Sequence, residues 1–364
     1  MKSAQHSSFP ISRRQDVSDK RLHERHQYRG VFISDLHLGT SWCLARDIVQ
    51  FLNHIETRRL DAVGDNADCW VLGIYRPHKL GKLLERRVYA GQAQLTVVQK
   101  MLRLSRRGTR IILYAGNHDE VLGNFHGALF GNVRIRRNSS YRTSDGRRYF
   151  VTHGHDFDGF IRHWHWLASH GARAFLLLSK LSIHLDRLQK KLHIHDFFRS
   201  LGWRSHWSLA HAIQKREEES AYNQAYLQTV MTYLFMENAR EYTRHKKDGV
   251  QPRYYNGIVC GHTHVADKLV FESPRDKATG EIIGPPTVEY WNTGHWTGPP
   301  GHENLQDEDW RPYVKHPPCT AVVEYAEDDE DGHVKGELGH VIWVPGEGIR
   351  PFTPMSKHSR LRTY

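Results

Sequence analysis

Short apolar runs alternate with stretches of helical periodicity in the first third of the chain. Ile48, Leu52 and Ile55 recur at helical spacing, so a helix is expected over residues 45–58. It follows an apolar run, GVFIS, that is typical of a short buried strand. Alternation of strand and helix of this kind predicts a layered α/β domain. The expected strands are residues 30–34, 60–63, 110–115, 149–152, 257–260, 287–292, 320–325 and 340–344.

A second helix is expected at residues 92–107. Leu95, Val98 and Leu102 share one face of it, which we expect to point inward, and Gly108 provides a stop signal.

The stretch 159–250 breaks the alternation and has the character of an insertion. Its leucines recur at spacings of three and four, which indicates the apolar stripe of one helix, and a second helix is expected from Ser208 towards Arg244. Segments 273–284 and 297–318 are rich in Gly, Pro and charge, so we expect extended loops there. The predicted segments are a disordered basic start (1–28), a core (29–158 and 251–345), an inserted helical cap (159–250) and a basic C-terminal tail (346–364).

Composition is ordinary for a globular protein. The 364 residues are 39% hydrophobic and 25% charged, which excludes a collagen-like, low-complexity or wholly disordered chain. The four cysteines are scattered and form no CxxC pair, so a reducing compartment is expected. No stretch approaches the roughly 18 apolar residues of a spanning helix. We therefore expect a cytoplasmic protein, and peripheral attachment to the inner membrane stays open.

The net charge of +11 favours an anionic partner, and its distribution is uneven. Residues 159–216 hold ten Lys and Arg against two Asp, a local charge of +8, and four Trp lie among them. Aromatic and basic residues together suit an anionic membrane surface, although packing within a helical cap explains the leucines better than a membrane anchor does. Single-stranded nucleic acid is the weaker alternative, because the rest of the chain is slightly acidic outside the tails.

Residue types that bind metals follow five of the expected strands. In open α/β sheets, ligands bind beyond the carboxyl ends of strands, so these loops can converge although they are far apart in sequence. A single such pair would be weak evidence, but five in succession are not. The five loops are Asp35-Leu36-His37, Gly64-Asp65-Asn66-Ala67-Asp68, Gly116-Asn117-His118-Asp119, His153-Gly154-His155 and Gly261-His262-Thr263-His264.

These loops resemble, in order, the motifs of the calcineurin-like metallophosphoesterases: D-x-H, G-D-x-x-D, G-N-H-D/E, an H-G or G-H element, and G-H-x-H. Within that superfamily the chain is most similar to the bacterial UDP-2,3-diacylglucosamine diphosphatase-like branch. The likeness lies in ISDLHLGT, VGDNADCW, AGNHDEVL, SDGRRYFVTHGHDFDGF, GIVCGHTH, YWNTGHW and CTAVVEY. It implies a two-sheet α/β sandwich flanked by helices, with an inserted helical cap.

The resemblance also implies a ligand set for two divalent ions. One ion would be held by Asp35, His37 and His264, and Asp65 would bridge both. The second ion would be held by Asn117, His153 and His262. Oxygen and imidazole donors without thiolates suit Mn²⁺, which we expect, with Fe and Zn²⁺ as alternatives.

Further residues of these motifs have expected roles around the metals. His118 would stabilise the transition state or protonate the leaving oxygen, with Asp119 as its orienting partner. Asp68 would support the ligands from outside or cap a loop. His155 stands where the branch usually has Asp, and would support the ligands or face solvent.

The implied activity is hydrolysis of a phosphoester or pyrophosphate. The diphosphate of a nucleotide-linked lipid or a similar amphiphile is the first expectation, so a phosphorylated small molecule or lipid is the expected partner. A nuclease or nucleotide phosphodiesterase is the alternative within catalysis. A non-catalytic scaffold that keeps the fold is a third, which the complete ligand set disfavours.

Overall fold

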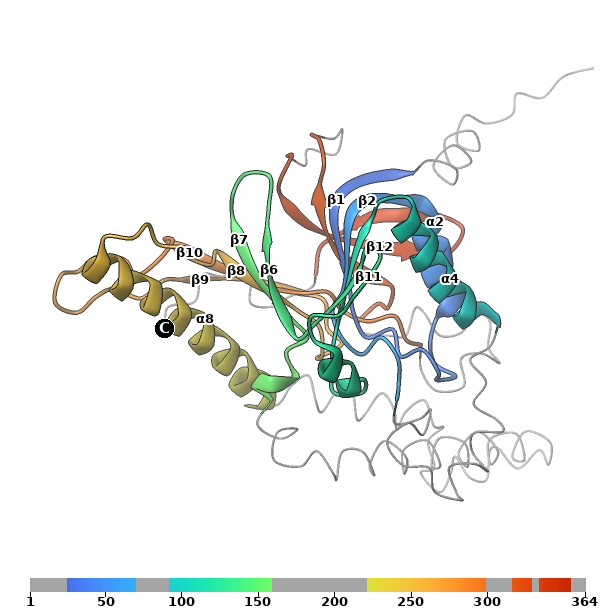
Figure 1. The fold of residues 1–364 in the computed structure, drawn as a ribbon, viewed down its shortest axis with the longest axis horizontal. Helices are drawn as coiled ribbons and strands as arrows, with labels where there is room; N and C mark the ends of the chain where they lie inside the picture. The colour runs from blue at the N-terminus through green and yellow to red at the C-terminus, as the bar shows by residue number, and fades with distance from the viewer. Residues whose placement is uncertain (1–24, 70–91, 159–220, 299–315, 329–333, 355–364) are drawn as a thin grey trace, which may run out of the picture.

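Two mixed β-sheets form the framework of the protein (Figure 1). The computed structural model describes residues 25–69, 92–158, 221–298, 316–328 and 334–354. The larger sheet has eight strands and the smaller has five, so the predicted α/β class is confirmed.

The eight-stranded sheet has the order β13-β12-β11-β1-β2-β3-β5-β4. Strands β1, β2, β3 and β5 are parallel, and antiparallel strands flank them on both sides. The strands are β1 (His26–Ile33), β2 (Ile55–Ala62), β3 (Arg110–Tyr114), β4 (Leu129–Phe130), β5 (Val133–Arg136), β11 (Thr320–Tyr325), β12 (Leu338–Val344) and β13 (Gly348–Phe352).

The five-stranded sheet has the order β6-β7-β8-β10-β9. Its three central strands are parallel, and each edge strand is antiparallel to its neighbour. The strands are β6 (Asn138–Arg142), β7 (Arg148–Thr152), β8 (Gly257–Cys260), β9 (Asp267–Glu272) and β10 (Thr287–Asn292).

The two sheets share a buried core on their facing surfaces. Successive side chains of a strand point to opposite faces. In β1, Phe32 therefore joins the core between the sheets, whereas Val31 and Ile33 join the core on the other face. In β8, Val259 faces the first sheet and Ile258 faces away from it. Apolar residues on both faces explain why these strands read as continuous hydrophobic runs.

Helices cover the outer faces of both sheets. Helices α2 (Ala45–His54) and α4 (Gln92–Arg106) pack on the large sheet, and α8 (Ala221–Asp248) packs on the small one. Two 3₁₀ turns, η1 (Glu120–Phe125) and η2 (His155–Phe157), follow β3 and β7. No helix in the described part of the chain combines the length and apolar character needed to cross a membrane.

Two features of the expected helices differ in the structure. The first helix ends at His54, and β2 begins at once, because Ile55 and Thr57 are buried in strand-like alternation with exposed Glu56. The prediction that Leu95, Val98 and Leu102 face inward is wrong, since all three are exposed. The buried face of α4 is formed instead by Val97, Met101, Leu104 and Ser105.

The ends of the predicted core need correction. Strand β1 begins at His26, inside the segment 1–28 that was expected to be disordered, and β13 occupies residues 348–352 of the expected C-terminal tail. Of the predicted cap, the structure describes α8 onward, and residues 159–220 lie outside the described residues. The edge strands β6 and β9 were not predicted. Strand β6 is polar apart from Tyr141 and gives no hydrophobic alternation, and β9 contains only a short apolar run, Leu269–Phe271.

Candidate metal centre

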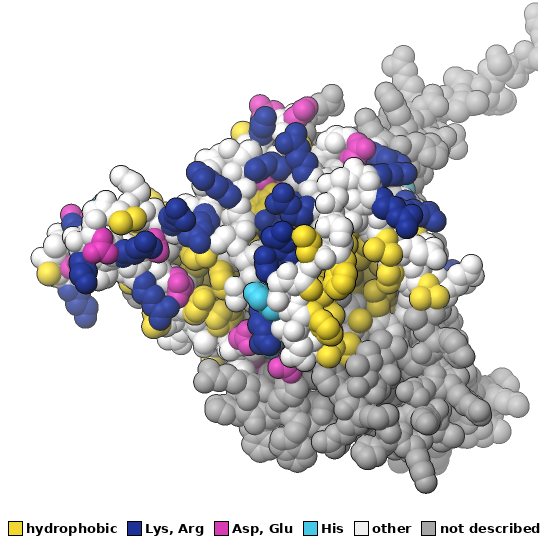
Figure 2. Space-filling view, viewed as in Figure 1, with side chains coloured by type: hydrophobic (Ala, Val, Ile, Leu, Met, Phe, Trp, Pro, Cys, Tyr) yellow, Lys and Arg dark blue, Asp and Glu magenta, His cyan; other side chains and the backbone are white. Residues whose placement is uncertain are grey.

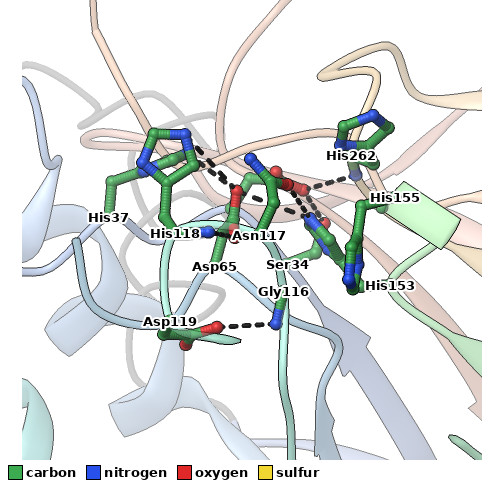
Figure 3. Close-up of polar contacts among 12 residues, drawn as sticks. Ser34, His37, Asp65, Gly116, Asn117, His118, Asp119, His153, His155 and His262 are labelled. Carbon is green, nitrogen blue, oxygen red and sulfur yellow. Dashed lines mark hydrogen bonds and ion pairs between the residues drawn. The ribbon is translucent and has the colours of Figure 1, made fainter. Parts of the chain in front are cut away.

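Predicted site residues gather where the parallel strands of the two sheets end. Asp35 and His37 follow β1, Asp65 follows β2, and the loop from Gly116 to Asp119 follows β3. From the other sheet, His153 follows β7 and the histidines at 262 and 264 follow β8. Both sheets thus direct their carboxyl ends to one place, where Figure 3 shows the side chains facing one another.

The backbone at this place is strained. Six residues other than glycine have a positive φ in the described part of the chain, and five of them are predicted ligands. Such a conformation costs an L-residue of order 1–3 kcal/mol, so it persists only where the surroundings hold it. The five are Asp35 (55°), His37 (46°), Asp65 (50°), His262 (72°) and His264 (58°).

Carboxylates and imidazoles form three overlapping groups that could each hold a metal ion. In each group the ligand atoms lie within 4.8 Å of one another. Asp35 belongs to two of the groups, and so does Asp65, which joins the two sides of the site. The groups are Asp35, His37 and His264; His37, Asp65 and His118; and Asp35, Asp65 and His153.

The first group brings donor atoms from both sheets together. His264 Nε2 lies 3.1 Å from Asp35 Oδ1 and 3.4 Å from His37 Nε2. The backbone N–H of His262 donates to Asp35 Oδ2 at 3.0 Å, and this bond fixes the carboxylate against the β8 loop. Ser34 also donates to Asp35, so the carboxylate is held by two neighbours.

Asp65 lies at the middle of the site. Its Oδ2 atom is 3.4 Å from His153 Nε2 and 3.7 Å from His37 Nε2. His153 Nδ1 contacts the carbonyl oxygen of Val63 at 2.8 Å, which leaves Nε2 facing Asp65 and, at 3.2 Å, Asn117 Oδ1. A backbone carbonyl of this kind commonly fixes the tautomer of a ligating histidine.

Buried charges at the site compensate one another. Burial lowers the pKa of His153, but the Asp65 carboxylate more than offsets this and raises it to about 10. Burial raises the pKa of Asp65, yet the imidazoles of His153 and His118 hold it well below its ordinary value. Protons on histidines thus supply the positive charge that buried carboxylates require.

His118 pairs with Asp68. His118 Nδ1 lies 2.9 Å from Asp68 Oδ2, and its Nε2 lies 4.0 Å from Asp65 Oδ2. Burial lowers the pKa of His118, but the Asp65 and Asp68 carboxylates raise it overall. His118 is therefore a partly exposed imidazole at the rim of the cluster, with its protonated form favoured.

The structure corrects the expected role of Asp119. Its fully buried carboxylate accepts the backbone N–H of Gly116 at 2.6 Å and that of Asn66 at 2.8 Å, below the site in Figure 3. It thereby ties the loop after β3 to the loop after β2. Asp68 holds the Nδ1 side of His118, the position predicted for Asp119.

His262 lies beside the three groups and belongs to none of those that the described residues form. Its Nε2 atom contacts Asp158 Oδ2 at 3.0 Å, and its ring lies 5.8 Å from that of Tyr226 in α8. His155 is mostly buried, with its ring 5.5 Å from that of His153, and burial together with His153 lowers its pKa to about 4.

The sequence did not single out three residues that contact the site. Asp158 contacts His262, and Ser34 links Asp35 to the β10 loop through Thr293 Oγ1 at 2.5 Å. Gln94, in the first turn of α4, is bonded to the loop after His37. Asp158 is the last residue of the H-G-H-D-F-D stretch that begins at His153. This short separation in sequence from a predicted ligand was the one available sign that Asp158 contacts the site.

The donors present fit divalent metal ions. The Nε2 atoms of His37 and His264 face each other at 3.4 Å. Two protonated imidazoles at this distance would repel each other, whereas a metal ion could accept a lone pair from each. Two buried carboxylates and four buried or partly buried imidazoles offer the mixed oxygen and nitrogen set that Mn²⁺, Fe and Zn²⁺ accept. A cation bound here would balance the negative charge of Asp35 and Asp65.

No model of a known protein family matches the chain, and no curated protein matches it either. What the protein does is therefore inferred from its residues and their geometry.

Proposed function

We propose that the protein is a hydrolase of phosphoester or pyrophosphate bonds that uses two divalent metal ions. The observation that carries this proposal is the meeting of Asp35, His37, Asp65, His153 and His264 at the carboxyl ends of two sheets. The order of the sequence motifs supports the proposed family, the calcineurin-like metallophosphoesterases with their two-sheet sandwich, and within it the UDP-2,3-diacylglucosamine diphosphatase-like branch.

The ligand assignment follows the groups of donors. Asp35, His37 and His264 would hold one ion and His153 with Asn117 the other, with Asp65 between them. We assign His262 to the second ion because it is the first histidine of the G-H-x-H motif. Ions held there, with Mn²⁺ expected, would act as Lewis acids on a phosphoryl group and make water a better nucleophile.

The chain itself supplies a proton donor. In the protonated imidazole of His118, Nδ1–H donates to Asp68, and Nε2–H would donate to an oxygen of the substrate. Delivery of this proton to the leaving oxygen is the role that fits a histidine at the rim of the cluster with a raised pKa.

The substrate class is proposed from the sequence motifs. The diphosphate of a nucleotide-linked lipid or similar amphiphile is our first choice, and the residues that would select it fall largely in the predicted cap.

One comparison of substrates tests the function. Protein loaded with Mn²⁺ is expected to release UMP from a UDP-linked lipid sugar faster than it cleaves bis(p-nitrophenyl) phosphate, p-nitrophenyl phosphate or single-stranded DNA. Preference for the diester or DNA would favour the nuclease alternative. Bound metal without turnover of any of the four would favour the non-catalytic scaffold.

The metal assignment needs its own variant. Asp65→Ala is expected to lower metal content and abolish turnover, because Asp65 belongs to two donor groups. Asp248→Ala, at the exposed end of α8, is the matched control and should bind metal like the wild type. Two bound metals and full activity in Asp65→Ala would show that the assignment is wrong.

A further inference from the structure

Helix α8 runs antiparallel to β8 along the small sheet (Figure 1). Its start lies beside the loop after β8, where the Tyr226 ring is 5.8 Å from the ring of His262. Further along α8, the side-chain amide of Asn238 donates to the carbonyl of Tyr255 at 2.9 Å and accepts its N–H at 2.8 Å, just before β8 begins. Figure 2 shows Lys, Arg, Asp and Glu side chains over the far half of α8. The buried start of the helix therefore belongs to the metal end of the sheet.

The side chain of Tyr226 fills the space between two loops that carry predicted ligands. It is buried, and its hydroxyl lies so close to Gly154 that a Cβ added there would be 2.3 Å away. Gly154 also has a φ of 106°, so the turn needs glycine for its backbone as well as for the tyrosine. The same hydroxyl interacts with the thiol of Cys260 at the end of β8. Tyr226 therefore contacts the chain directly after His153 and just before His262.

Three neighbours hold the imidazole of His262. Its Nε2 atom contacts Asp158 Oδ2 at 3.0 Å, which makes Nδ1 the nitrogen that would bind a metal ion. A hydrogen bond at one nitrogen still allows the ring to tilt. The rings of His153, at 5.3 Å and 72°, and of Tyr226, at 5.8 Å and 45°, limit that tilt. The direction of Nδ1 therefore depends on a side chain of α8.

We propose that Tyr226 positions His262 for the second metal ion, so that helix α8 sets how tightly this ion is held. The inference rests on the proposed function, because His262 is assigned to that ion by its motif. The packing that fixes Tyr226 in place comes from four further buried residues of α8, which are Leu227, Val230, Met231 and Leu234. Since α8 lies in the predicted cap (159–250), the affinity for a metal ion depends on a segment that contains no predicted ligand.

Calorimetric titration of the metal-free protein with Mn²⁺ tests this role. Tyr226→Leu keeps an apolar side chain in the core but removes the ring that contacts His262. It should weaken the binding of one of the two ions by about 10- to 100-fold, the usual cost of losing a group that orients a metal ligand. Tyr226→Phe keeps the ring and should bind both ions like the wild type.

Leu234→Ala is the matched control for a loss of core packing. Leu234 is fully buried in the same apolar cluster as Tyr226 and lies about 12 Å further along α8, away from the ligand loops. The variant should lower the melting temperature at least as much as Tyr226→Leu does. It should nevertheless bind both Mn²⁺ ions like the wild type, because it leaves the contact with His262 in place.

His262→Ala separates this inference from the proposed function. It should weaken the binding of the same ion, and Tyr226→Leu should add little in that background. If His262→Ala binds two ions like the wild type, the ligand assignment fails and the role of Tyr226 fails with it. If His262→Ala loses one ion while Tyr226→Leu binds both normally, only the role of Tyr226 is overturned. The same holds if Tyr226→Phe or Leu234→Ala loses as much affinity as Tyr226→Leu.

Discussion

Replacing Asp68 by Asn removes one negative charge from beside His118 and keeps the size of the side chain. Asp68 Oδ2 is 2.9 Å from His118 Nδ1 and 3.5 Å from His37 Nδ1, and the side chain is buried. The change therefore acts first on the proton and orientation of His118, whose contact is the shorter of the two, and it removes no donor because Asp68 belongs to none of the three groups.

The expected loss follows from the type of hydrogen bond. A hydrogen bond between charged groups contributes about 1.5–3 kcal/mol, which corresponds to roughly 10- to 150-fold in rate if it is needed in the transition state. The carboxylate raises the pKa of His118, so Asp68→Asn should lower it. The alkaline limb of the rate profile should then move to lower pH, because the proton is lost earlier.

The assay is steady-state kinetics of the wild type and Asp68→Asn on two substrates that differ only in their leaving group. The loss should be large for an alkyl ester, whose leaving oxygen needs a proton, and small for a p-nitrophenyl ester, which does not. In a His118→Ala background, Asp68→Asn should have little further effect, because Asp68 is expected to act through His118. Asp248→Asn serves as a charge-matched control on the surface.

Two results would refute this reasoning. Equal losses for alkyl and p-nitrophenyl substrates would show that His118 does not protonate the leaving group. Loss of bound metal in His118→Ala would make His118 a ligand, a role that its place in the group with His37 and Asp65 would allow.

Three further predictions concern stability and metal affinity. Asp119→Ala should lower the free energy of unfolding by about 2–5 kcal/mol, measured in urea, because two buried N–H groups lose their acceptor; an unchanged midpoint would contradict this. Burial lowers the pKa of His340 from 6.5 to about 4, so the unfolded chain takes up the proton first and stability falls as the pH drops through this window. His340→Asn should remove about 3 kcal/mol of that dependence in metal-free protein, whereas parallel pH curves would exclude His340 as the source. Gly261→Ala should weaken Mn²⁺ binding roughly tenfold by calorimetry, because its Cβ would lie 2.6 Å from Asp35 Oδ2; wild-type affinity would show that the loop can shift without cost.

Strands that are buried on both faces were predictable, and edge strands were not. The bounds of β8, β10 and β11 agree with the sequence prediction, because each strand is rich in buried apolar and aromatic residues. In β6, Tyr141 is the one buried residue, so hydrophobicity carries almost no signal there. Strand β6 is held instead by pairing with β7, a contact between segments that local periodicity does not describe.

In helix α4, hydrophobic periodicity alone could not predict which face is buried. Its sequence contains two sets of apolar residues at helical spacing, one through Val97 and Met101 and one through Leu95 and Val98. Either could face the core. The choice depends on how the helix docks against α2 and β3, which is a tertiary property.

The positions of the donors were predictable, but their pairing was not. Parallel strands bring their carboxyl ends to one edge, so motifs at strand ends could be placed together from the sequence. The partners Asp68 for His118 and Asp158 for His262 depend on loop conformations. Several of these loops use a positive φ, which is uncommon for any residue other than glycine and which hydrophobic periodicity does not reveal.

The left-handed backbone at five predicted ligand positions has a consequence for laboratory evolution. Glycine adopts a positive φ without steric cost, so a library screened for heat resistance alone would reward glycine at the half-exposed His264. This gain would remove a predicted metal donor. Selection for robustness and selection for turnover should therefore diverge at this codon, and a thermostable lineage obtained without an activity screen should accumulate inactive members.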